Sequence, residues 1–190
     1  MKKISLSFVL TLFAFAAFSQ TWVSDPAHSH LGFTISHLTI SEVAGNFKQF
    51  TVKVVATKPD HSDAQVELTA QIASINTDVE QRDTHLKSPD FFDAQKYPTL
   101  NFKSTSIKKV KGNNYKLIGN LTMHGITKPV VLDVVFKGSV TNPMSKQLIS
   151  GFTVTGTLKR TDFDIGSKFP SAMVGNEVNI SASVEFSESK

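Results

Sequence analysis

Apolar and polar residues alternate along most of this chain. Residues 66–72 read VELTAQI, with an apolar side chain at every second position. Period two is typical of a β-strand whose two faces meet different surroundings. The alternation recurs often enough to predict eight strands. Their apolar faces carry, in chain order, Phe33, Ile35 and His37; Val52 and Val54; Val66, Leu68, Ala70 and Ile72; Leu100 and Phe102; Tyr115, Leu117, Gly119, Leu121 and Met123; Val130, Leu132, Val134 and Phe136; Phe152, Val154, Gly156 and Leu158; and Val178, Ile180, Ala182, Val184 and Phe186.

Short turn sequences separate these strands, among them Gly112-Asn113-Asn114, His124-Gly125 and Asn142-Pro143. Strands joined by short turns pair antiparallel, and a long twisted antiparallel sheet can bury its edges by closing on itself. The pattern therefore favours an all-β fold, an eight-stranded antiparallel up-and-down barrel. Periodicity alone leaves a two-sheet sandwich open as the alternative.

One long stretch, residues 82–98, abandons the alternation and reads RDTHLKSPDFFDAQKYP. Helix-compatible residues run from Asp78 to Lys87, and Pro89 prevents simple continuation of a helix. We expect a short helix there and a second helical turn starting at Ser88, both between strands 3 and 4 of the barrel. The pair would lie across one end of the barrel, with the apolar side chains of Phe91 and Phe92 directed into it.

Small residues on the inward faces, including Gly119, Gly156, Ala70 and Ala182, suggest that the barrel holds a cavity. The alternative is that they only make room for bulky neighbours. The wall residues are almost all aliphatic or aromatic, so we expect an apolar ligand. Strands of roughly ten residues, tilted by about 40°, would form a tube about 25 Å tall, which suits a long lipid chain.

The N-terminus has the features of a secretory signal peptide. Lys2 and Lys3 precede an apolar run from Leu6 to Phe18, and small residues at positions 17 and 19 suit cleavage after Ser19. The run is shorter than the roughly 20 residues that cross a bilayer, so we expect no transmembrane segment. We predict a signal peptide at residues 1–19 and one exported domain at residues 20–190. The chain contains no cysteine, which excludes disulfides and thiol chemistry.

Charge and motifs exclude several function classes. The 20 Lys and Arg residues become 18 without Lys2 and Lys3, against 16 acidic residues, and no basic stripe indicates nucleic-acid binding. His28 and His30 share a strand face, but no spacing assembles three metal ligands, so we expect no metal site. Nucleophile-elbow, phosphate-loop and dinucleotide motifs are missing from the sequence, and we expect neither a cofactor nor catalytic residues. An enzyme using His85 and Asp83 at the barrel mouth stays open as a lesser alternative.

Spaced motifs along the chain support a family assignment. They include Trp22, Asp25, His28-Ser29, Gly32-Phe33, Gly45, Phe47, Ser74-Ile75, Thr77, Arg82-Asp83, His85-Leu86, Ser88, Asp90-Phe91-Phe92-Asp93, Tyr97-Pro98, Phe102, Gly119, Leu121-Thr122, Gly125, Thr127-Lys128, Arg160, Phe163 and Ile165-Gly166. With these residues the chain resembles the YceI-like, polyisoprenoid-binding, lipocalin-like proteins. It departs from their pattern at Asp164, where many relatives have glycine. The resemblance implies a lipocalin-like barrel, exported to the bacterial periplasm or secreted, that holds a polyisoprenoid, an isoprenoid quinone or another amphiphilic lipid.

Within such a barrel, Arg82 and His85 would bind the ligand head group, because the guanidinium of arginine suits a phosphate. The alternative is that Arg82 and Asp83 only form salt bridges that pin the lid. The ligand could instead be a fatty acid or fatty amide. A further alternative is that the barrel is filled by side chains and the protein acts through its outer surface. Whether the chain forms a homodimer stays open. The expected ligand-binding residues are Phe33, Ile35, His37, Arg82, His85, Phe91, Phe92, Phe102, Tyr115, Leu117, Phe136 and Phe152.

Overall fold

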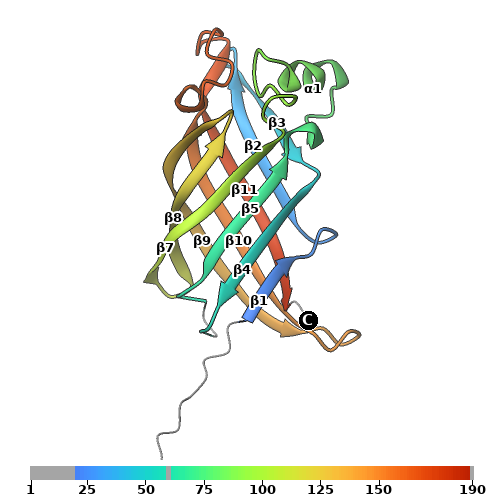
Figure 1. The fold of residues 1–190 in the computed structure, drawn as a ribbon, viewed down its shortest axis with the longest axis vertical. Coiled ribbons are helices and arrows are strands. Elements are labelled where there is room, and N and C mark those ends of the chain that lie inside the picture. Colours follow the sequence, from blue (N-terminus) through green and yellow to red (C-terminus); the bar gives the residue numbers. More distant parts are fainter. Residues whose placement is uncertain (1–19, 59–60, 189–190) are drawn as a thin grey trace, which may run out of the picture.

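Eight antiparallel strands close into a barrel in the computed structural model, which describes residues 20–58 and 61–188 (Figure 1). The pairing of β1 with β11 completes the ring, so the barrel prediction is confirmed and the sandwich alternative is wrong. The predicted signal peptide, residues 1–19, lies outside the described residues. The ring runs through β1 (Gln20–Ser24), β4 (Phe50–Ala56), β5 (Gln65–Gln71), β7 (Thr99–Lys111), β8 (Asn114–Met123), β9 (Ile126–Thr141), β10 (Leu148–Lys159) and β11 (Val174–Glu188).

Three further strands extend the wall toward one end of the barrel: β2 (His30–His37), β3 (Ser41–Phe47) and β6 (Ile75–Asn76). β1 and β2 lie one after the other along β11, with Trp22 opposite Glu188 and His30 opposite Ser183. The alternation did not predict this interruption. Asp25 lies at the break, where its carboxylate accepts a hydrogen bond from the backbone of Ala27.

Glycine in the wall makes room for large side chains. A Cβ added to Gly119 would lie 2.4 Å from Cζ of Phe102, and one added to Gly156 would lie 2.5 Å from Cδ2 of Leu132. Both positions therefore match the interpretation that small residues accommodate bulky neighbours. The space beside these two glycines is filled by Phe102 and Leu132, so it does not form the cavity described below.

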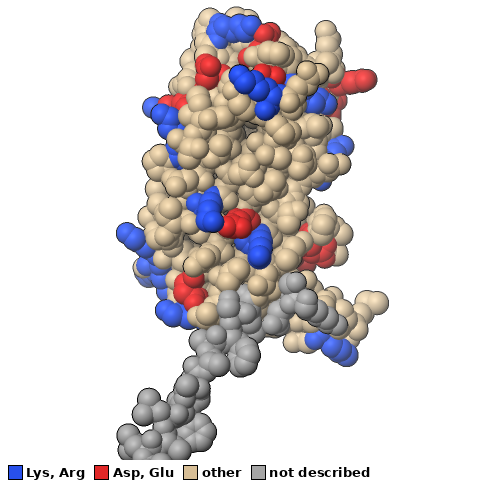
Figure 2. Space-filling model, in the orientation of Figure 1, with Lys and Arg blue, Asp and Glu red and all other residues tan. Residues whose placement is uncertain are grey.

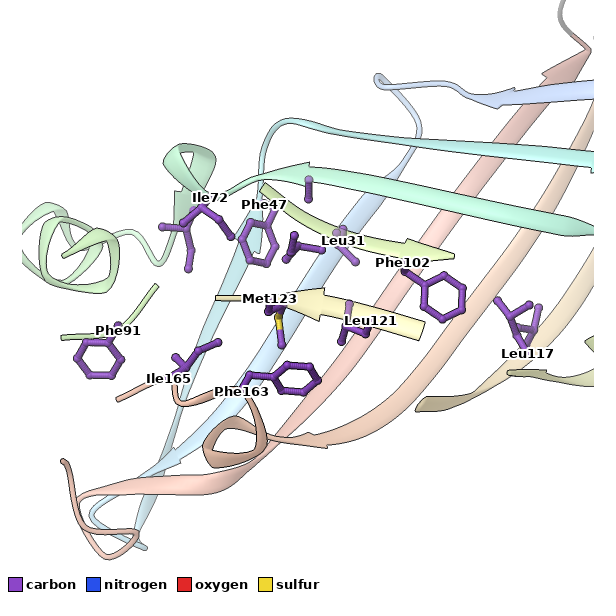
Figure 3. Packing of buried hydrophobic residues seen from close by; sticks show 14 of the residues in the cluster. Leu31, Phe47, Ile72, Phe91, Phe102, Leu117, Leu121, Met123, Phe163 and Ile165 are labelled. Atoms are coloured by element: carbon purple, nitrogen blue, oxygen red, sulfur yellow. The ribbon is translucent and has the colours of Figure 1, made fainter. Parts of the chain in front are cut away.

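Two apolar clusters form the core. The larger cluster includes Phe47, Phe102 and Leu121, and Figure 3 shows it extending from Phe91 in the insert to Leu117 farther along the strands. The smaller cluster surrounds Trp22 where β1 meets β11 and β4. Both clusters come from the inward positions of the alternating strands, as expected when burial of apolar surface drives folding.

The insert contains one helix, α1 (Glu80–Lys87), which lies at one end of the barrel (Figure 1). The expected second helical turn at Ser88 is wrong. Consecutive hydrogen-bonded turns follow instead, with backbone bonds from Phe91 to Ser88 and from Phe92 to Leu86. This path turns Phe91 back toward the barrel.

The outer surface mixes both signs of charge. Figure 2 shows cationic and anionic side chains interspersed over the visible face. Exposed ion pairs link neighbouring strands, such as Lys103 with Glu67 and Lys116 with Asp133. Within residues 20–58 and 61–188, no helix has the length and apolar character needed to cross a membrane.

Candidate functional site

A cavity of about 460 Å³ occupies the barrel interior. Its wall is mainly aliphatic and aromatic, with contributions from nearly every strand of the barrel. The exposed residues His37 and Met173 are part of the lining, so the cavity opens at the end that carries α1. The volume lies within the range of about 300–1,000 Å³ typical of small-molecule sites.

Most polar side chains of the lining lie around this mouth. Arg82 and His85 come from α1, while His37 ends β2. Arg160 belongs to the 3₁₀ helix η2 (Arg160–Phe163), which follows β10. An apolar tube with polar groups at one opening matches an amphiphilic ligand whose head group stays at the mouth.

Thr77 holds the start of the insert through two side chains of α1. The Asp83 carboxylate accepts hydrogen bonds from the Thr77 backbone N–H at 2.8 Å and from its hydroxyl at 2.6 Å. Arg82 donates through Nε to the Thr77 hydroxyl at 2.7 Å and through Nη2 to the Thr77 carbonyl at 2.8 Å. Both side chains therefore pin the start of α1 through hydrogen bonds to Thr77, and the described residues show no salt bridge of Arg82 or Asp83, which corrects the alternative considered from sequence. Arg82 still lines the cavity, so it can fix the lid and face a ligand at once.

The part of the insert from His85 to Phe91 contacts the loop that joins η2 to β11. Nε2 of His85 lies 3.1 Å from Oδ2 of Asp90, whose other carboxylate oxygen pairs with Lys168 of the loop. The hydrogen bond from Lys168, and then that from His85, hold the pKa of the Asp90 carboxyl below its ordinary value. The His85 ring also meets the Phe91 ring edge-on, with centroids 5.0 Å apart. Polar and aromatic contacts therefore act together at one side of the mouth.

Arg160 organises the same loop from inside. Its side chain is only 4 % exposed, and its nitrogens donate to the backbone carbonyls of five residues. Burial lowers the pKa of the guanidinium from its ordinary value. The acceptors are Ile165, Gly166, Phe169, Val174 and Gly175. The sequence did not indicate this role, because the acceptors converge only when the loop folds back over η2.

His61 closes the opposite end of the cavity. It lies in the connection between β4 and β5, and its ring lines the cavity while packing edge-on against three aromatic rings. The centroid distances are 5.5 Å to Trp22, 5.6 Å to Phe136 and 5.4 Å to Phe152. Sequence reasoning missed this residue, since a loop position has no alternation to point it inward.

Ten of the twelve expected ligand-binding residues line the cavity. Tyr115 and Phe136 do not, which corrects their expected placement. Tyr115 is buried in the core near the hairpin between β7 and β8, and Phe136 packs on Phe152. Whether the ten lining residues bind a ligand stays a prediction. They are Phe33, Ile35, His37, Arg82, His85, Phe91, Phe92, Phe102, Leu117 and Phe152.

The geometry does not form the acid–base group considered for an enzyme. His85 contacts Asp90 and not Asp83, whose carboxylate is bonded to Thr77. The Ser88 hydroxyl donates to the His85 carbonyl at 2.7 Å rather than to its ring, so no nucleophile and base are paired there. Across the part of the chain that the structure describes, no group of three or more His, Cys, Asp or Glu residues could hold a metal ion.

Comparison with known proteins agrees with this geometry. A UPF0312 protein of Staphylococcus aureus (strain N315) is 39% identical over 170 residues, covering 87% of this chain and 96% of that protein. The Campylobacter jejuni YCEI crystal structure has a TM-score of 0.75 and 32% identity, and the match covers 82% of this chain and 91% of that one. A polyisoprenoid binding domain from Saccharophagus degradans, implicated in plant cell wall breakdown, shares the fold with a TM-score of 0.63 at 13% identity, over 88% of this chain and 98% of that one. The model of the YceI-like domain matches residues 22–186, and the chain belongs to that family.

Proposed function

We propose that this protein binds and carries a long-chain amphiphilic lipid, of polyisoprenoid or isoprenoid quinone type, in the barrel cavity. One observation carries the proposal: the cavity wall is mainly apolar, and most of its polar side chains lie around the mouth beside α1. The polyisoprenoid binding domain from Saccharophagus degradans supports the ligand class through its shared fold. The N-terminal sequence supports export to the periplasm or the exterior.

Burial of the hydrocarbon chain supplies the affinity in this proposal. Each buried methylene contributes about 0.8 kcal/mol, so many chains of suitable length and width would bind. The twelve residues of β10, tilted by about 40°, span roughly 30 Å, more than the ten-residue estimate from sequence. A fatty acid or fatty amide is the second candidate, because the wall alone does not distinguish hydrocarbon chains.

Head-group selectivity would come from Arg82. Its Nε and Nη2 bind Thr77, and no partner of Nη1 is found among residues 20–58 and 61–188. The residue also lines the cavity mouth beside His85. A guanidinium with a remaining donor edge suits a phosphate or another anionic head group.

A ligand-retaining mass spectrum tests the proposal. Protein purified from its host and sprayed under native conditions should carry a lipid-sized adduct that organic solvent extracts and that rebinds unchanged. Ala182→Phe narrows the bore and should abolish rebinding, whereas Ala44→Phe on the exposed β3 surface should not. Equal rebinding by both folded variants would contradict the assignment of the cavity as the site, and chemical conversion of the ligand would favour an enzyme.

A second experiment tests the head-group assignment. Arg82→Ala should weaken binding of a prenyl phosphate by about tenfold or more, the loss expected for one charge-assisted hydrogen bond. A prenyl alcohol of the same length should bind as before. Lys87→Ala on the same helix removes a cation that does not line the cavity and serves as the control. Equal losses for both ligands would mean that Arg82 acts only by holding the lid on Thr77.

A further inference from the structure

Exposed apolar side chains flank the cavity mouth. Leu38 and Met173 are each 48% exposed, and Ile40 is 84% exposed. The Leu38 N–H donates to the Met173 carbonyl at 3.0 Å, which joins the β2–β3 hairpin to the loop before β11. Met173 itself lines the cavity. We call Leu38, Ile40 and Met173 the apolar rim. The β2–β3 hairpin lies at the upper end of Figure 1, the end that also carries α1.

The tip of the hairpin departs from ordinary turn chemistry. Leu38 and Thr39 both have positive φ, 50° and 62°, and the Ile40 N–H donates to the His37 carbonyl at 3.2 Å. Two consecutive residues of positive φ form a type I′ turn, for which Asn-Gly is preferred and β-branched residues are disfavoured. The tip thus presents apolar side chains where the backbone would favour polar or glycine residues. Local departures of this kind concentrate at functional sites.

The two loops at the rim are also uncharged at their tips. Residues 38–40 read LTI and residues 170–173 read PSAM, and the next charged residues along the chain are Glu42 and Lys168. Val110 and Met144, exposed apolar residues at the opposite end, have lysines close to them in the sequence. Val110 lies among Lys108, Lys109 and Lys111, and Met144 is two residues from Lys146.

We propose that the apolar rim inserts into the surface of a lipid bilayer, so that a hydrocarbon chain passes between the bilayer and the cavity without crossing water. This proposal rests on the proposed function as a lipid carrier, and it names the partner from which the ligand comes. An uncharged apolar tip can enter the acyl boundary of a bilayer, whereas a charged tip would lose hydration there. The adjoining opening gives the chain a continuous apolar path into the cavity.

Flotation with neutral vesicles tests the docking surface. The full mature protein should float with phosphatidylcholine vesicles, and high salt should not release it because the tip carries no charge. Ile40→Asp should reduce the vesicle-bound fraction by about tenfold or more, since it puts a charge in place of an aliphatic side chain that the bilayer would bury. Met144→Asp at the opposite end is the matched control, because Met144 is 92% exposed and far along the chain from the rim. Both positions are exposed, so neither change disturbs the core.

Transfer of a fluorescent prenyl lipid separates docking from binding. With donor and acceptor vesicles, Ile40→Asp should slow transfer about tenfold while affinity for the same lipid in detergent micelles stays unchanged. If the parent protein does not bind the lipid in micelles, the proposed function itself is contradicted. Docking through the rim is overturned if Ile40→Asp floats like the parent. It is also overturned if flotation requires anionic lipid and is lost in high salt, because membrane binding would then belong to the lysine-bearing end. It is also overturned if the rim holds two copies together, seen as a parent dimer that Ile40→Asp makes monomeric.

Discussion

Phe91 stacks on Phe169 with ring centroids 4.9 Å apart and an angle of 12° between the ring planes. The contact joins the insert to the loop between η2 and β11, and both residues line the cavity. The Asp90 carboxylate pairs with Lys168 beside the stack. The insert and the loop therefore form one closure at the mouth, whose strength should govern how fast a ligand leaves.

Phe169→Ala should accelerate ligand release and lower the free energy of unfolding by about 1–3 kcal/mol, because a half-buried aromatic ring and its stacking partner are lost. Stopped-flow displacement of a bound fluorescent lipid measures the rate, and urea denaturation measures stability. Phe169→Leu keeps most of the apolar volume and should release at an intermediate rate. Release at the parental rate from a folded Phe169→Ala protein would show that ligands leave by another route.

The ion-paired carboxylate of Asp90 predicts a pH dependence of the same closure. Lys168 and His85 hold its pKa below the ordinary value, so the stabilisation is complete above the unfolded value of about 3.9 and is lost as the pH falls through the lower folded value. Ligand release by the parent should therefore accelerate below about pH 4. Asp90→Asn should release faster at neutral pH and lose that acid step.

Asp133→Asn provides the control for this experiment, because Asp133 pairs with Lys116 on the barrel wall away from the mouth. Its release rate should follow the parental pH profile. An acid step retained in Asp90→Asn would assign the pH response to another group.

Arg160 should contribute more to stability than the ion pairs of the surface. Replacing it by methionine leaves the carbonyls that it binds without their donor, and each buried unsatisfied group costs about 1–3 kcal/mol. We expect Arg160→Met to lower the free energy of unfolding by at least about 3 kcal/mol. The free energy of unfolding of Arg160→Lys should lie between those of the parent and of Arg160→Met. An ammonium keeps three donors but lacks the planar geometry of the guanidinium.

Urea denaturation of the two Arg160 variants, with Lys103→Met as a surface control, measures this ranking. Lys103 forms an exposed ion pair with Glu67, worth about 0–1 kcal/mol. Equal stability of Arg160→Met and the parent would mean that water replaces the guanidinium at the loop carbonyls.

The barrel was predictable from sequence because period two identifies the inward face of each strand directly. The same period does not tell how far along the barrel axis a residue lies. For this reason Tyr115 and Phe136 were expected in the cavity wall. Both point to the interior side of their strands but pack near the closed end, where Phe136 meets His61.

The insert shows a second limit of the sequence. Its composition placed Phe91 and Phe92 at the mouth correctly, but the helical turn expected after Ser88 is absent from the described structure. Pro89 is compatible with either a helix start or a turn. Tertiary contact decides between them here, because turns let Phe91 reach Phe169.

Asp164, where the family resemblance led us to expect glycine, tests a backbone effect. It follows η2 with φ 55° and ψ 27°, the left-handed region, and the Ile165 N–H that comes next donates to the Arg160 carbonyl at 3.1 Å. Residues other than glycine are disfavoured in this conformation, although aspartate adopts it more readily than most. Asp164→Gly relieves that strain but gives the unfolded chain more freedom, so the free energy of unfolding should rise by about 0–1 kcal/mol.

Asp162→Gly is the matched change two residues earlier, inside η2, where no positive φ is present to favour glycine. It should destabilise the protein by about 0.5–1 kcal/mol through backbone entropy alone. Urea denaturation of both variants therefore should give shifts of opposite sign. Destabilisation by Asp164→Gly as large as that by Asp162→Gly would mean that the Asp164 side chain stabilises the turn by more than its backbone strain costs.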